Sequence, residues 1–586
     1  MPLHRLAFTA LFLLIFIGEG SIQAQQSFNF EIKSTTGSAE AIQKINYPKK
    51  ASDSLTAIKI VNEVIGELHG QGYLLAEKIK VESDRNKITA FVEIGPLFEW
   101  LEIRPGNLDT DLWRKLNFRE SNFKDKPFRI DQIANLESSI LTYAERNGFP
   151  FSSLKFDSLQ VVNQEFSAAL AVDFGPKITF DSVSVIQSNI LKSRFVGAYL
   201  GIHLGDPYDQ QLVNAVVRKL RKLPYLKLSK SPVLTFQNSE GKITLEVERR
   251  PINTIDGIIG FLPNNSRESG LLITGQFDLE LYNPFASGKH IGLHWRRLSE
   301  ETQTLKMNYD HPNLLGSVML LKSEFNFLKQ DTTFNRRVLT LDLNLNLGIN
   351  SNLGVITHIT ATDLTATSRY QNNNQLPDIL DFRLTRYGLR YSFNSLDDLF
   401  LPRKGLFLEL SGSVGNKIIR PNVDLPNTLY EGTDLKTLQY QYDLTVNQYL
   451  NLASKTTFFM GLQGGLISGE NLFQNDAFRI GGLNSLRGFN ESYFFTTGFL
   501  FANFESRFYL DETSYLLLFT DIGYVESDFV NQISKSFEWP LGVGTGISFA
   551  TNTGIFNFVY ALGTSKSTGA INFNQSKIHF GFTTRF

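Results

Sequence analysis

The second half of the chain follows a repeat of two residues. From Leu339 to Leu347 every odd position is leucine and every even position is polar. Because successive side chains of a strand point to opposite faces, this stretch predicts a strand with one apolar and one polar face. Ile578, Phe580 and Phe582 alternate with polar or small residues in the same way. Such strands can face lipid around a wet lumen or bury their apolar side in a soluble barrel, and the pattern alone does not choose between these.

Sixteen segments of this kind follow residue 252. They are predicted at 253–262, 271–282, 288–298, 302–309, 316–328, 334–348, 353–366, 383–396, 405–418, 436–450, 455–469, 498–510, 514–525, 537–550, 555–562 and 576–586. Long polar connections such as 470–497 alternate with short turns such as 451–454. An even strand number with long loops at one end is typical of outer-membrane barrels. The predicted fold class over 252–586 is therefore a 16-stranded antiparallel transmembrane β-barrel.

The N-terminus predicts export from the cytoplasm. Residues 1–24 have the form of a signal peptide, with His4 and Arg5 before the apolar run Leu6 to Ile17 and a small residue, Ala24, at the end. That run is shorter than the ~18 residues that a membrane-spanning helix needs. No later apolar run is long enough, so a chain that spans the membrane must do so as a closed barrel.

Residues 28–251 contain a weak threefold repeat. Val92 to Pro96 recurs as Val172 to Pro176, and a third strand, Ile243 to Glu248, ends shortly before Pro251. An amphipathic helix precedes each of these strands. The repeat predicts three α+β modules at 28–97, 98–176 and 177–251, although three core modules without a binding role would give the same pattern.

Composition excludes several kinds of chemistry. The chain has no cysteine, so it has no disulfide, thiolate metal site or N-terminal lipid anchor on cysteine. A net charge of −1 gives no reason to expect a nucleic-acid partner. Gly542, Gly544 and Gly546 are spaced as in a nucleotide fingerprint, but strand residues follow them where a phosphate-binding helix would begin. His290 and His294 lie on a predicted strand, where their spacing is incidental. We expect no enzyme activity, no cofactor and no metal.

One loop stands out inside the barrel region. The glycine pair Gly481-Gly482 precedes Leu486-Arg487-Gly488-Phe489 between the eleventh and twelfth predicted strands. A glycine pair followed by an arginine before Gly-Phe suits a tightly folded loop that holds one cation at a fixed point. The loop is predicted to fold into the lumen, and the alternative is an external arginine that pairs casually at the surface.

The 486–489 motif resembles the VRGF- or VRGY-type motif of the BamA/TamA superfamily (bacterial surface antigen family). Further segments fit this family: Leu281 to Phe285 with Gly288, Pro402 to Gly405, Phe519 to Gly523 and the C-terminal Phe586. Leu486 replaces the more common valine. With three modules and sixteen strands, the chain is most similar to TamA-type members.

The resemblance implies roles for particular residues. Arg487 would reach into the lumen and pair with Asp521, and Glu505 is a second candidate on the preceding strand. The modules would be POTRA domains in the periplasm of a Gram-negative-type bacterium. The first and last barrel strands would form a weak seam, where Gly581 and Phe586 lie and where substrate strands pair. Simple small-residue packing is an equal account of Gly581.

The resemblance also implies partners and leaves the function open between three classes. Unfolded outer-membrane or surface proteins and the lipid bilayer would be partners, and a periplasm-spanning TamB-like protein is a further candidate. The leading hypothesis is an assembly or insertion factor. The alternatives are a two-partner-secretion-like pore, whose members usually have two modules and an N-terminal plug helix, and a passive porin-type barrel, for which three modules would be superfluous.

Overall fold

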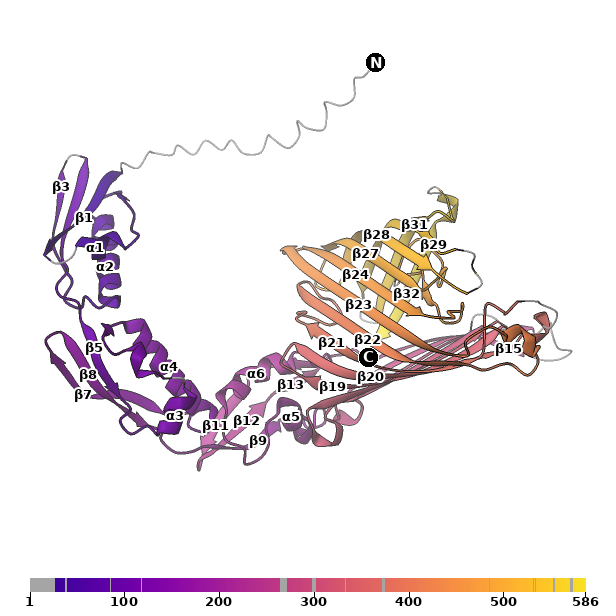
Figure 1. Cartoon of the computed structure of the whole chain (residues 1–586), viewed down its shortest axis with the longest axis horizontal. Coiled ribbons are helices and arrows are strands. Elements are labelled where there is room, and N and C mark those ends of the chain that lie inside the picture. Colours follow the sequence, from indigo (N-terminus) through magenta and orange to yellow (C-terminus); the bar gives the residue numbers. More distant parts are fainter. Residues whose placement is uncertain are drawn as a thin grey trace, which may run out of the picture. The chain divides into compact units, whose positions relative to one another are not determined.

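A computed structural model of the protein describes residues 27–585, apart from 37–38, 85, 117, 264–270, 298–301, 332, 371–374, 484, 531, 533, 552–553 and 570–572. The expected signal peptide at 1–24 and the C-terminal Phe586 lie outside the described residues. The chain divides into two compact units, one reaching to Ile178 with Pro207–Asp209, the other comprising Thr179–Asp206 and Gln210 onward. Figure 1 shows helices and short strands in the first part of the chain and a large sheet in the rest.

The first unit begins with a four-stranded sheet in the order β2-β1-β4-β3. Its elements are β1 (Phe28–Thr36), α1 (Ala39–Gln43), β2 (Lys50–Ala51), α2 (Ser54–Gly70), β3 (Glu77–Asp84) and β4 (Lys87–Glu93). Helix α2 begins after Asp53, whose Oδ1 accepts a hydrogen bond from the Thr56 N–H at 2.7 Å, as expected of an N-cap. Its stripe from Ala57 to Leu68 is buried with the inner face of the sheet.

A second module in the same unit repeats this plan. It contains β5 (Glu99–Arg104), α3 (Thr110–Lys115), β6 (Lys126–Pro127), α4 (Ile130–Arg146), β7 (Ser153–Val162) and β8 (Glu165–Asp173). The sheet order β6-β5-β8-β7 matches the first module, and the central strands are parallel in both. Leu136 and Ile140 of α4 are buried against it, as the helical spacing predicts.

The second unit opens with a third α/β module. It consists of β9 (Thr179–Val185), α5 (Ser193–Leu200), α6 (Gln210–Leu220), β10 (Leu226–Leu228), β11 (Val233–Gln237), β12 (Glu240–Leu245) and β13 (Val247–Arg249). The predicted strand 243–248 is divided, because β12 pairs with β9 and β11 whereas β13 pairs with β10. Among the described helices, none is long and apolar enough to cross a membrane.

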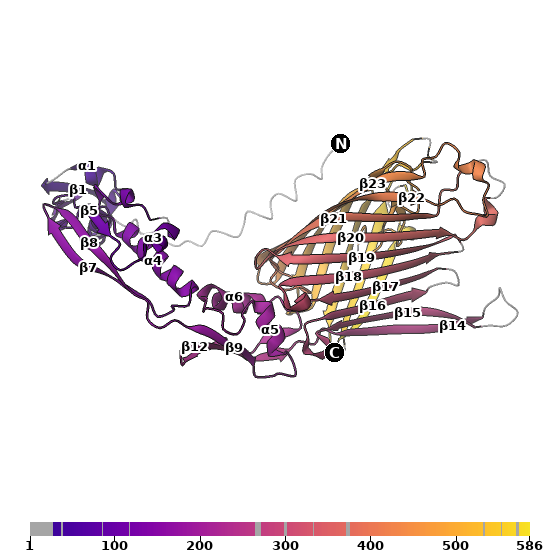
Figure 2. The same cartoon turned by 60° about the horizontal axis from the view of Figure 1, so that its bottom comes forward.

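The rest of the second unit is the barrel, whose strands lie side by side in chain order (Figure 2). They are β14 (Thr254–Pro263), β15 (Leu271–Tyr282), β16 (His290–Arg297), β17 (Gln303–His311), β18 (Met319–Gln330), β19 (Phe334–Asn346), β20 (Ser351–Leu364), β21 (Phe382–Asn394), β22 (Gly405–Ile419), β23 (Lys436–Ala453), β24 (Thr456–Gly469), β27 (Gly498–Tyr509), β28 (Tyr515–Ser527), β29 (Ser536–Glu538), β30 (Leu541–Ala550), β31 (Gly554–Thr564) and β32 (Lys577–Arg585). A short hairpin of β25 (Phe478–Ile480) and β26 (Phe494–Thr496) lies within the loop 470–497.

The predicted strand number is confirmed. Strands β29 and β30 both pair with β28, so within the described residues they occupy one position and the sheet has sixteen. The break falls at Trp539-Pro540. Proline has no N–H to donate to a ladder, which explains the interruption.

The direction of the alternation is also confirmed. Leu341, Leu343 and Leu345 are on the exposed outer face of β19, whereas the side chains of Asp342 and Asn344 are buried in the lumen. Parts of β27 and β28 have buried apolar side chains as well. Phe501 of β27 and Val525 of β28 pack against Ile480, Leu486, Phe489 and Phe494 of the loop 470–497.

The first and last strands meet over a very short length. Thr254 pairs with Arg585 and Ile255 with Thr584. Among the described residues, each other complete pair of neighbouring strands extends over eight residue pairs or more. Gly581 of β32 stays within the regular ladder opposite Asn557 of β31.

Candidate functional site

The loop 470–497 makes a tight turn at its glycine pair. Gly481 and Gly482 have φ of 125° and 99°, values that residues with a Cβ rarely adopt. The Gly481 N–H donates to Ser485 Oγ at 2.9 Å, and the Gly482 N–H donates to the Leu486 carbonyl at 3.2 Å. The turn brings Leu486 into an apolar cluster with Phe501 on the wall. The residue after Leu486 is thereby held against β27 and β28.

Arg487 contacts the wall through its backbone, its guanidinium edge and its guanidinium face. Its backbone N–H and Nε donate to Asp521 Oδ2 at 3.0 and 2.8 Å, and Nη2 donates to Asp521 Oδ1 at 2.6 Å. Nη1 donates to Glu505 Oε1 at 2.5 Å. The guanidinium carbon lies 3.7 Å from the centre of the Phe519 ring. Charge-assisted bidentate contacts of this kind are among the strongest polar contacts in proteins, so they fix the loop in position.

The charges of this cluster are balanced. Glu505 also accepts hydrogen bonds from Arg507, at 2.8 Å from Nε and 2.6 Å from Nη2. Asn503 Nδ2 donates to Asp521 Oδ1 at 2.9 Å and to the Ser485 carbonyl at 3.1 Å. Two guanidinium groups thus face two carboxylates with their other lone pairs satisfied, the condition under which buried ions are tolerated.

Glycines on the wall make room for the motif. A Cβ at Gly542 of β30 would lie 2.1 Å from the Arg487 carbonyl oxygen, and one at Gly488 would lie 2.7 Å from backbone atoms of β31. A Cβ at Gly563 of β31 would lie 2.5 Å from the Gly488 carbonyl oxygen. Gly542, which has nucleotide-fingerprint spacing in the sequence, therefore allows the loop backbone to touch the barrel wall.

A second ionic contact holds the start of the same loop. Lys417 of β22 forms an ion pair with Asp476, and Lys417 Nζ also donates to the Asn471 carbonyl at 2.9 Å. Gln439 Nε2 of β23 donates to Asp476 Oδ1 at 3.1 Å, and the Phe473 N–H donates to its Oδ2 at 2.9 Å. The loop is thus bonded both to β22–β23 and to β27–β28.

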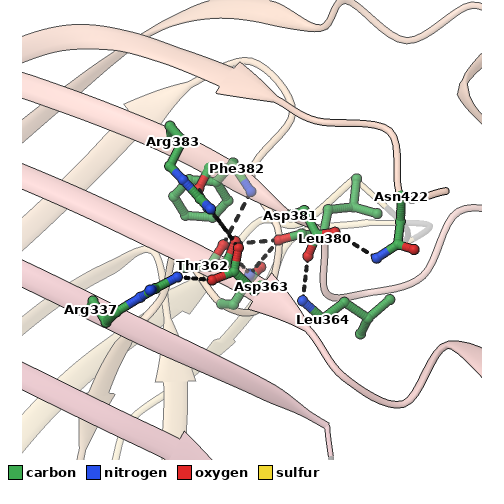
Figure 3. A network of polar contacts seen from close by, with 10 residues as sticks. Arg337, Thr362, Asp363, Leu364, Leu380, Asp381, Phe382, Arg383 and Asn422 are labelled. Carbon is green, nitrogen blue, oxygen red and sulfur yellow. Dashed lines mark hydrogen bonds and ion pairs between the residues drawn. The ribbon is translucent and has the colours of Figure 1, made fainter.

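A polar network at the outer ends of β19–β22 continues this anchoring (Figure 3). Asp363 is paired with both Arg337 and Arg383, the latter at 2.6 Å from Nη2. Asp381 accepts hydrogen bonds from the Leu364 N–H and, at 2.7 Å, from Asn422 Nδ2. These contacts join the loops that follow β20 and β22.

The long loop is bonded to the same region. Asn475 Nδ2 donates to Thr362 Oγ1 at 3.1 Å and to the Leu380 carbonyl at 2.8 Å. Arg479 Nη1 donates to Gln330 Oε1 at the end of β18, at 2.7 Å. Contacts from β18 to β31 therefore hold the loop 470–497.

The structure brings only part of the predicted site together. Gly481, Gly482 and residues 486–489 form one cluster with Asp521 and Glu505, whereas Gly581 lies apart from it in β32. Sequence reasoning missed Lys417, Asp476 and Gly542. Lys417 carried a usable signal, because the alternation of β22 places it on an inward position, where a lysine needs a partner.

His290 and His294 of β16 lie close to carboxylates of the neighbouring strands. Among the described residues, no group of three or more His, Asp or Glu side chains is placed to hold a metal ion. His290 and His294 instead hydrogen-bond the two oxygens of Glu280, at 2.5 and 2.8 Å from Nε2. Both histidines are thus used in contacts with carboxylates of the barrel wall.

Comparison with known proteins agrees with this architecture. The model of the Omp85 superfamily domain matches residues 283–586, more than half of the chain. CdiB from Escherichia coli is similar in structure, with a TM-score of 0.56 and 12% identity over 90% of this chain and 97% of that one. CdiB from Acinetobacter baumannii has a TM-score of 0.54 and 14% identity over 84% and 90%. BamA from Haemophilus ducreyi lacking POTRA domains 1–3 matches with a TM-score of 0.41 and 15% identity over 84% and 100%.

No curated relative matches the chain by sequence. The outward apolar face, the loop-filled lumen and the family match identify an outer-membrane β-barrel preceded by POTRA-like periplasmic modules. The chain belongs to the Omp85 superfamily.

Proposed function

We propose that the protein inserts or translocates other polypeptides at the outer membrane, and that it releases them through the junction between β14 and β32. The observation that carries this proposal is the length of that junction, two residue pairs against eight or more for each other complete pair of neighbouring barrel strands among the described residues. Each backbone hydrogen bond contributes about 0.5–1.5 kcal/mol. Parting β14 from β32 therefore costs much less than parting any other complete neighbouring pair.

An incompletely paired strand can template a new one. Unpaired N–H and C=O groups on a strand edge accept an incoming strand by β-augmentation. In a membrane these groups have no water to bond with, which favours pairing with a substrate strand. The short junction thus supports a lateral exit in which substrate strands pair before release.

The modules offer edges for the preceding step. Strand β3 ends the first sheet and β7 the second, and both are largely exposed. Three apolar side chains of β7 are at least half exposed, those of Leu159, Val161 and Val162. We propose POTRA modules at 28–97, 98–176 and 177–251, with the barrel from 252, and assign to them the capture of extended segments. A TamB-like periplasm-spanning partner belongs to the same proposal.

A disulfide across the junction tests the exit. The chain has no cysteine, so Ile255→Cys with Thr584→Cys introduces one pair at a registered position. We expect the oxidised variant to lose function and a reductant to restore it. A matched control, Leu341→Cys with Thr357→Cys, joins two fully paired strands and should remain active. Full activity of the oxidised junction variant would falsify the lateral exit.

Depletion of the protein tests the substrate class. A general loss of outer-membrane barrels would support assembly, whereas loss of a single exported protein would support dedicated secretion. Unchanged membrane composition would point to a passive pore and overturn both. The measurement is quantitative proteomics of isolated outer membranes before and after depletion.

A further inference from the structure

A polar cavity of about 460 Å³ lies where the third module meets the first barrel hairpin. Its lining comprises Ser188, Asn189, Lys192, Tyr225, Arg249, Arg250, Asn253 and the segment 281–286. Three of these residues are cationic, and no described lining residue is acidic. Arg250 is already paired with Asp398 at 2.7 Å. Lys192 and Arg249 leave an uncompensated positive charge at the cavity, which favours an anion.

The turn beside the cavity exposes a large apolar side chain. Between β15 and β16, Phe285 has φ of 60° and is 85% exposed. The turn is held by Asn283 Nδ2, which donates to the Ile190 carbonyl at 2.7 Å, and by the Lys192 N–H, which donates to the Ala286 carbonyl at 3.2 Å. Positive φ at a bulky residue is unfavourable and persists only where surrounding contacts enforce it.

The next turn at the same end of the barrel has the same combination of positive φ and an exposed apolar side chain. Between β17 and β18, Leu315 has φ of 53° and is 96% exposed, and Asn313 takes the place of Asn283 two residues before it. In two adjacent turns, a residue with unfavourable positive φ thus holds an exposed apolar side chain. Exposed apolar residues beside cations are what proteins use to bind the boundary between headgroups and acyl chains.

We propose that this cavity binds the phosphate of a phospholipid headgroup from the periplasmic leaflet, through Lys192 and Arg249, while Phe285 and Leu315 enter the acyl region. The inference does not depend on what the protein transports. Asn253 lines the cavity, and the next residue, Thr254, forms one of the two pairs that join β14 to β32. The lipid would therefore lie at the base of the junction.

The test uses full-length protein purified in detergent and stripped of lipid, with binding followed by native mass spectrometry. The probe is dihexanoylphosphatidylglycerol, compared with inorganic phosphate and with dihexanoylglycerol, which lacks the phosphate. We expect one saturable site for the phospholipid. Lys192→Gln with Arg249→Gln should weaken binding of the phospholipid about tenfold or more, because charge-assisted hydrogen bonds to the phosphate are lost.

Matched variants distinguish recognition of the headgroup from recognition of the acyl chains. Phe285→Ser with Leu315→Ser should weaken binding of the phospholipid, whereas Lys242→Gln and Ile186→Ser, exposed positions of the same module, should not. Heat-modifiable migration on gels checks that each barrel is folded. If inorganic phosphate binds as tightly as the phospholipid, the cavity is a site for free phosphate. If dihexanoylglycerol binds as tightly as the phospholipid, the phosphate is not recognised. Either result, or the absence of a saturable site, overturns the proposal.

Discussion

Lys417 and Asp476 form an ion pair in which both side chains are almost completely buried. The pair joins strand β22 to the loop that also carries Arg487. Within the same loop, Arg487 is bonded to Asp521 of β28. One loop is therefore bonded to the inner wall at two places by charged side chains that are almost completely buried.

Replacing Lys417 with methionine should destabilise the barrel. Asp476 would remain buried without its cation, and breaking a buried pair in this way costs about 3–5 kcal/mol. We expect a lower temperature for loss of the folded band in heat-modifiability gels. The double variant Lys417→Met with Asp476→Leu should be more stable than Lys417→Met alone, because no uncompensated charge remains. If the two single effects simply add, the pair does not couple loop and wall.

Arg487→Ala should leave the barrel inserted but impair its function. The substitution leaves Asp521 without its bidentate donor, although Arg507 still neutralises Glu505. The loop should then become cleavable by protease added outside intact cells. The activity of Arg487→Lys should lie between those of the wild type and Arg487→Ala, because lysine keeps the charge but lacks the planar guanidinium group. Arg420→Ala, at an exposed loop position, is the control; wild-type activity of Arg487→Ala at normal abundance would contradict the pinned loop.

Two glycine substitutions should differ sharply in effect. Gly542→Ala places a Cβ 2.1 Å from the Arg487 carbonyl oxygen, so the loop must shift and function should fall as in Arg487→Ala. Gly581→Ala meets only Asn557 Cβ, at 4.0 Å, and should fold normally. Overpacking of this kind typically costs about 1–3 kcal/mol. Thermal stability and protease access to the loop measure both variants, and a silent Gly542→Ala would refute the close contact. A functional defect of well-folded Gly581→Ala would instead support a role at the seam.

Stability should depend on pH through Lys222 of the third module. Its Nζ donates to the Asn394 carbonyl at 2.9 Å, and burial lowers the pKa of Lys222 to about 8. Between that pH and the ordinary value near 10.5 the unfolded chain binds more protons than the folded one, so stability rises with pH through this window. We expect the thermal midpoint of the wild type to rise relative to that of Lys222→Met as the pH increases from 8 to 10. A constant difference would show that the amine is not desolvated.

Local periodicity was sufficient to predict the barrel. The leucines of β19 alternate with Asp342 and Asn344, and burial of these polar residues in the lumen follows from the same period of two. The break at Pro540 falls inside a segment predicted as one strand, 537–550. A proline in the ladder predicts such a break, but not that both pieces stay in register beside β28.

Contacts between distant segments could be predicted only where a motif marked them. Arg487 was assigned Asp521 and Glu505 through a family resemblance, and the structure has these contacts. Lys417 and Asp476 are separated by 59 residues, and no pattern in one sequence states that they meet. Gly542 was equally hidden, because a glycine in a strand indicates close approach without naming what approaches.

The bonds of the 470–497 loop run to strands from β18 to β31, so it acts as a brace across that arc of the cylinder. The strands beyond the arc, β32 and β14 to β17, contain the two-pair junction. When a transported polypeptide widens the barrel, these strands should therefore move apart most. The strands that are bonded to the loop should keep their curvature.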